Sequence, residues 1–159
     1  MTVGELNAIV RTFTLHKDLL RRRSPFFMAK LERHSGGSDL ALPLEEAEVF
    51  YLLVRWLYTD CIEHKPHQND DIHSYDLFEP MKYFERLIKL YFRADRMQIT
   101  DLMNLTIDVI GKFIQTYRWV FRSEQINLVY EKTKTGSELR RFVLAQCAHS
   151  PHTLQLGSG

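Results

Sequence analysis

The chain is poor in the features that mark secreted and membrane-spanning proteins. It has two cysteines, Cys61 and Cys147, which are too few for the disulfide framework of a small secreted domain. No charged-then-apolar leader of the secretory kind is visible, and the longest apolar runs fall far short of the roughly 20 residues that cross a bilayer. We therefore expect an intracellular protein, cytoplasmic or nuclear, with no membrane partner.

The chain also lacks an excess of charge of one sign. Lys plus Arg number 21 and Asp plus Glu number 20, so the formal net charge is +1. Nucleic-acid-binding domains usually show a clustered basic excess, so we expect no nucleic-acid partner. Two local mixtures could in principle hold a nucleic acid strand, and we interpret both as solvated helix faces or the rim of a protein interface. They are Arg21, Arg22 and Arg23, and Arg118, Trp119 and Arg122.

Signatures of common enzymes are missing as well. The sequence has no G-x-x-x-x-G-K-[ST], G-x-G-x-x-G, H-E-x-x-H or G-x-S-x-G motif. His16 lies close to Asp18, but a catalytic base needs a nucleophile and an orienting partner that converge in a pocket. We interpret His16 as a structural corner residue, and we expect no enzymatic activity, no cofactor and no small-molecule substrate.

The best candidate for a metal site is a polar stretch at residues 61–73. Three imidazoles and a thiolate could hold zinc, but their spacing matches none of the compact ligand pairs of zinc fingers. We expect a solvated loop, and metal binding by this loop stays an open alternative. The potential ligands are Cys61, His64, His67, Asp70, Asp71 and His73, with a weaker set at Cys147, His149 and His152.

The period of the hydrophobic pattern changes along the chain. Phe13 and Leu15 alternate with threonines, which predicts a strand over 9–15 paired with residues 1–4, and a short strand ends at Pro43. From residue 44 onward the spacing is helical. The sequence therefore predicts an α+β fold, a small, mostly N-terminal sheet capped by a cluster of helices. Helices are predicted at 17–23, 25–33, 49–57, 84–92, 99–117, 123–131 and 137–148.

Ser24 and Pro25 together predict a helix start. Serine offers a side-chain oxygen to the free amide groups of the first turn, and proline fits the first helical position. Of the residues that follow, Phe27 is expected in the core. Phe26 or Met28 should lean outward and form part of an exposed apolar patch, which on a domain surface marks a partner site.

Several separated motifs resemble those of the BTB/POZ domain family over roughly residues 2–117. The first is a strand that ends in F-x-x-H, followed by Leu and a Ser-x-x-F helix start, and the last is L-Y-x-x-A-D-x-x-x-I-x-x-L. Between them lies a strand and helix at Leu42, Pro43, Val49, Phe50, Leu53, Trp56, Leu57 and Tyr58. We divide the chain into a BTB/POZ-like domain at 1–117, a C-terminal helical extension at 118–156 similar to that of fungal members, and a candidate tag remnant at 157–159. The matching residues are Phe13, His16, Lys17, Leu20, Ser24 and Phe27, and Leu90, Tyr91, Ala94, Asp95, Ile99, Leu102 and Ile107.

The resemblance implies a non-catalytic protein–protein interaction module that mediates homo- or hetero-oligomerisation with another BTB-like domain. We expect Leu19, Phe26 and Met28 to contribute to that contact. An alternative is a substrate adaptor that binds a cullin-type ubiquitin-ligase scaffold, which would implicate Tyr58 and Ile62. The family's first strand is nearly absent here, so monomer and dimer both stay open, as does the identity of the partner.

Overall fold

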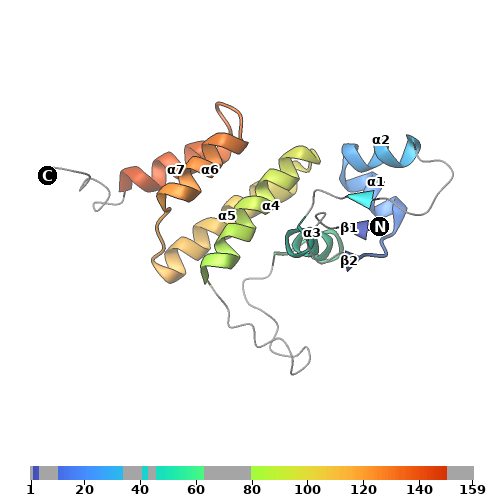
Figure 1. The fold of residues 1–159 in the computed structure, drawn as a ribbon, viewed down its shortest axis with the longest axis horizontal. Coiled ribbons are helices and arrows are strands. Elements are labelled where there is room, and N and C mark those ends of the chain that lie inside the picture. The colour runs from blue at the N-terminus through green and yellow to red at the C-terminus, as the bar shows by residue number, and fades with distance from the viewer. Residues whose placement is uncertain (1, 4–10, 34–40, 43–45, 63–79, 150–159) are drawn as a thin grey trace, which may run out of the picture. The chain divides into compact units, whose positions relative to one another are not determined.

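The computed structural model describes residues 2–3, 11–33, 41–42, 46–62 and 80–149 (Figure 1). The chain consists of two compact units, Met1–Thr106 and Ile107–Gly159. The elements are β1 (Thr2–Val3), β2 (Arg11–Thr12), α1 (Lys17–Arg23), α2 (Pro25–Arg33), β3 (Ala41–Leu42), α3 (Ala47–Thr59), α4 (Pro80–Arg96), α5 (Thr100–Tyr117), α6 (Ser123–Lys132) and α7 (Glu138–His149).

Within the described residues, the sheet of the first unit is smaller than the sequence predicts. Its strand order is β2-β1-β3, with β1 antiparallel to β2 and parallel to β3, and each strand has two residues. The strand predicted over 9–15 is wrong beyond Thr12, because the backbone leaves the ladder there. Phe13 turns to the ring of Phe50 at 5.2 Å between ring centroids, and the His16 amide donates to the Tyr58 hydroxyl. Residues 4–10 lie outside the described part of the chain.

Helices α1 and α2 have the predicted bounds, and Ser24 between them explains why. Its hydroxyl accepts a hydrogen bond from the Phe27 amide at 3.2 Å, as expected of a residue that caps a helix. The same hydroxyl donates to the Met97 carbonyl at 2.7 Å. Because Ser24 is fully buried, this second bond fixes the start of α2 on the turn that follows α4.

The core of the first unit lies mainly on one face of α3 and α4. Helix α3 contacts both α4 and α1, since its apolar residues recur at helical spacing. At the start of α3, the Lys89 ammonium lies 2.7 Å from a Glu46 carboxylate oxygen in a half-buried ion pair with α4. The largest fully buried side chains here are Phe27, Phe50, Leu53, Leu57, Phe84, Leu87, Ile88, Leu90, Tyr91, Met97 and Leu102.

Three helices end at a non-glycine residue in the left-handed region. The φ angles are 55° at Asp60, 56° at Gln98 and 50° at Arg118. After Gln98, the Ile99 amide donates back to the Ala94 carbonyl at 2.8 Å, a bond that satisfies one of the last carbonyls of α4. The chain therefore leaves these helices without glycine, at some cost in backbone strain.

The second unit is organised around contact between α6 and α7. Val129, Leu139 and Val143 form its buried apolar centre. Arg140 donates to the Tyr130 carbonyl at 2.6 Å and to the Thr133 hydroxyl at 2.9 Å, and it also bonds the Thr133 carbonyl. The arginine thus satisfies carbonyl groups left free at the end of α6.

Candidate interaction surface

The structure distributes the three predicted contact residues of α1 and α2 unevenly. Met28 is 44% exposed, whereas Leu19 and Phe26 are half-buried. The core position predicted for Phe27 is confirmed, since its exposure is 0%. Residues two apart on a helix do not face each other, so Phe26 and Met28 point in different directions around α2. Met28 therefore offers a partner the most apolar surface of the three.

Phe26 is partly covered by its own helix. Its ring packs edge-on against Phe27 with centroids 5.4 Å apart, and the Lys30 ammonium lies 5.4 Å from the Phe26 centroid. The pKa of Lys30 is lowered, first by burial and then by repulsion from Arg96 of α4. This side of α2 is thus a mixed aromatic and cationic surface.

A second exposed surface lies on α3. Tyr58 is 48% exposed and Tyr51 is 43% exposed. Arg55 stands between them, with its guanidinium 5.8 Å from the Tyr51 ring centroid. The three residues follow the i, i+4, i+7 spacing of one helix face. This spacing indicates that Tyr51 lies on the same face as Tyr58, although the sequence analysis did not single out Tyr51.

Ile62, which the adaptor alternative implicates, is buried in the single chain. Only 8% of its surface is exposed, so it offers a partner little area in the single chain. Its role in a contact stays a prediction, whereas Tyr58 is accessible.

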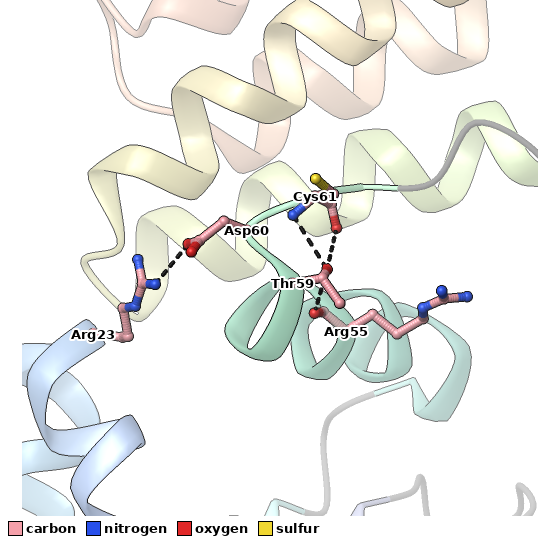
Figure 2. A network of polar contacts seen from close by, with 5 residues as sticks. All are labelled: Arg23, Arg55, Thr59, Asp60 and Cys61. Carbon is pink, nitrogen blue, oxygen red and sulfur yellow. Dashed lines mark hydrogen bonds and ion pairs between the residues drawn. The ribbon is translucent and has the colours of Figure 1, made fainter.

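Polar contacts fix the end of α3, as Figure 2 shows. The Thr59 hydroxyl donates to the Arg55 carbonyl at 2.8 Å and accepts from the Cys61 amide at 3.3 Å. The Asp60 amide donates to the Trp56 carbonyl at 2.8 Å, while its carboxylate lies 2.6 Å from the Arg23 guanidinium of α1. The residues that leave α3 are therefore held from both sides.

His16 and the aromatic–basic mixtures have structural surroundings. The Nδ1 atom of His16 lies 2.9 Å from the Tyr58 hydroxyl oxygen, and Asp18 pairs with Arg21 at 3.6 Å. In the second unit, the Arg122 guanidinium lies 5.6 Å from the Trp119 ring centroid.

The candidate metal ligands are mostly outside the described residues, including His64, His67, Asp70, Asp71, His73 and His152. Cys61 is exposed and Cys147 is half-buried, and both are free thiols. Within the described ranges, no three His, Cys, Asp or Glu side chains are grouped as a metal site would require. The prediction about the 61–73 loop is therefore not tested.

The order of elements, with short strands before α1, between α2 and α3, and then consecutive helices, defines a helix-rich domain of the BTB type. A comparison with protein-family models matches residues 6–114 to the BTB/POZ domain. The chain belongs to the BTB/POZ family, whose domains generally mediate protein–protein interaction and oligomerisation and are typically not enzymes. A search of curated proteins found no match.

A helix that crosses a bilayer needs about 20 predominantly apolar residues. Among the residues that the structure describes, no helix combines the length and the apolar character needed to cross a membrane.

Proposed function

We propose that this chain is a non-catalytic interaction module that associates with a second copy of itself or with a related BTB domain. The contact would bury apolar surface from α1 and α2, with polar rim residues setting the register. Met28 carries this proposal, because it is 44% exposed beside the fully buried Phe27. Leu19 and Phe26 would add area at the edge of the contact.

The test is the mass of the protein in solution after Phe26 and Met28 are both replaced by aspartate. Burying a carboxylate in an apolar contact is strongly unfavourable, so a dimer should become a monomer in light scattering after size exclusion. Met81→Asp is the matched control, since Met81 is 37% exposed on α4 and should leave the mass unchanged. Circular dichroism must show that the double variant is still folded. A monomeric wild type, or a folded double variant of unchanged mass, would refute self-association.

A second candidate function is a substrate adaptor for a cullin-type ubiquitin-ligase scaffold. The exposed α3 face with Tyr51, Arg55 and Tyr58 supports it, because tyrosine and arginine are enriched among the residues that dominate binding energy at interfaces. Ile62 would contribute only if the contact reaches beyond the end of α3.

This alternative is tested by capture of purified cullin N-terminal domains. Tyr58→Ala should abolish capture, and Met28→Asp should leave it intact because Met28 lies on α2. Failure of the wild-type chain to bind any cullin would leave self-association as the function.

We also propose the finer classification that the resemblance suggests. Residues 1–117 would form the BTB/POZ domain and 118–156 a helical extension of the fungal type, with 157–159 a tag remnant. The protein would act inside the cell, in the cytoplasm or nucleus, without enzymatic activity and without binding nucleic acid, a membrane or a small-molecule substrate. The α+β class would rest on the small sheet of β1, β2 and β3.

A further inference from the structure

Both ends of α1 are bonded to the end of α3. At the start of α1, the His16 amide donates to the Tyr58 hydroxyl at 3.3 Å, and the two rings meet edge to face. At its end, Arg23 pairs with Asp60 at 2.6 Å and lies 5.2 Å from the Trp56 ring centroid. The pairs His16–Tyr58 and Arg23–Asp60 together form what we term the α1 latch.

Besides the latch, α1 is held by the burial of Leu20 and by its contacts with α2. It has seven residues, and Leu20 is its one buried side chain. A helix this short is not stable by itself in water, because the unfavourable nucleation step is repaid by too few hydrogen bonds. Its helical state therefore depends on Leu20, on α2 and on the latch.

Movement of α1 would reach the proposed self-association surface. Leu19 lies on α1, and the single residue Ser24 separates α1 from α2, which carries Met28. Local opening of α1 would therefore displace Leu19 and the start of α2 together.

We propose that α1 is a latched segment whose local opening is controlled by the side chains at the end of α3. A partner that takes the Tyr58 hydroxyl or the Asp60 carboxylate for its own contacts loosens α1, and one that clamps α1 and α2 stabilises the latch. The consequence for binding rests on the proposed function, whereas the latch itself does not. By linkage, a partner bound at the end of α3 weakens the affinity for a partner on α1 and α2 by the same factor by which the second partner weakens the affinity for the first.

Hydrogen exchange of the full chain tests the latch. The double variant Tyr58→Phe, Asp60→Asn keeps the ring and the turn, since asparagine tolerates the left-handed region, but it loses the hydroxyl and the charge. The reporting amides are those of Leu20 and Ser24, which donate to His16 and Leu20 carbonyls at 3.2 and 3.1 Å. Each exposed polar contact of this kind adds little free energy, but the double variant loses two of them, and a small free-energy change is a large factor in an opening equilibrium. We therefore expect exchange in α1 to quicken roughly five- to thirty-fold.

The matched control is Asp18→Asn, which removes the Asp18–Arg21 pair within α1 and touches no residue of α3. Since Asp18 is the acidic residue of the first turn of α1, this change removes a favourable charge as well as the pair, and α1 exchange should quicken clearly less than in the double variant. Exchange in α6 should be unchanged in both variants, and a double variant that exchanges no faster in α1 than Asp18→Asn would count against the latch. Unchanged α1 exchange in the double variant would overturn the latch.

Self-association of the same variants separates this inference from the proposed function. Faster exchange in a chain that never self-associates supports the latch and refutes the proposed function. Faster exchange with several-fold weaker self-association supports both. Faster exchange with an unaltered dimerisation constant overturns the coupling of the latch to the self-association surface.

Discussion

Replacing Ser24 by alanine removes two hydrogen bonds with one atom. The Phe27 amide loses its cap, which typically costs about 1 kcal/mol. The Met97 carbonyl loses the hydroxyl that donates to it at 2.7 Å, and an unsatisfied buried polar group costs about 1–3 kcal/mol. Because Ser24 is fully buried, water cannot replace the hydroxyl without rearrangement. We expect the free energy of unfolding to fall by about 2–4 kcal/mol.

The measurement is urea unfolding of the full chain followed by circular dichroism, with Ser137→Ala as the control. Ser137 caps α7 in the same way, accepting from the Arg140 amide at 3.3 Å, but it is half-buried and makes no second bond of the Ser24 kind among those observed. Its loss should cost about 1 kcal/mol. If Ser24→Ala costs no more than Ser137→Ala, the reasoning about the buried bond to Met97 is wrong.

Three further changes test other contacts. The pKa of Lys30 is lowered from 10.5, first by burial and then by Arg96, so the contribution of this group to stability should rise as the pH increases from the lowered pKa to 10.5, where the unfolded chain still holds the proton that the folded chain has lost. Lys30→Gln should remove this part of the pH dependence in urea titrations at alkaline pH, and an unchanged slope would contradict the reasoning. Gln98→Gly should raise the free energy of unfolding by roughly 0.5–1 kcal/mol because glycine is unstrained at positive φ; a lower urea midpoint would exclude the strain. Arg140→Lys should cost about 1–3 kcal/mol, since an ammonium cannot reproduce the forked guanidinium contacts at the end of α6; an unchanged thermal midpoint would show that those contacts contribute nothing.

Local sequence signals were sufficient for the helices. The bounds of α1 and α2 could be predicted to the residue, because Ser24 and Pro25 both mark a helix start and nothing competes with them nearby. The apolar stripes of α3, α4 and α5 predicted the presence of these helices, since a 3.6-residue period sustained over several turns is typical of an amphipathic helix. Their bounds were predicted less well, because α4 runs from Pro80 to Arg96, beyond the predicted range of 84–92 at both ends. The core position of Phe27 followed from the same spacing.

Contacts between distant segments were not visible in the sequence. The bond from Ser24 to Met97 spans 73 residues, and no local pattern reports it. The strand at Phe13 was overpredicted because alternation measures only local preference, whereas Phe50 and Tyr58 determine where the backbone turns. The burial of Ile62 was also missed, because burial depends on neighbours from elsewhere in the chain.

Position 60 illustrates how narrow the choice of amino acid becomes when two demands coincide. The backbone there has a φ of 55°, which most side chains resist and which glycine, asparagine and aspartate accept. The Arg23 guanidinium forms an ion pair with this residue, and glycine and asparagine have no negative charge to form it. Glutamate has the charge but fits the left-handed backbone poorly. Aspartate alone meets both requirements, so natural variation at this site should be paired with variation at Arg23.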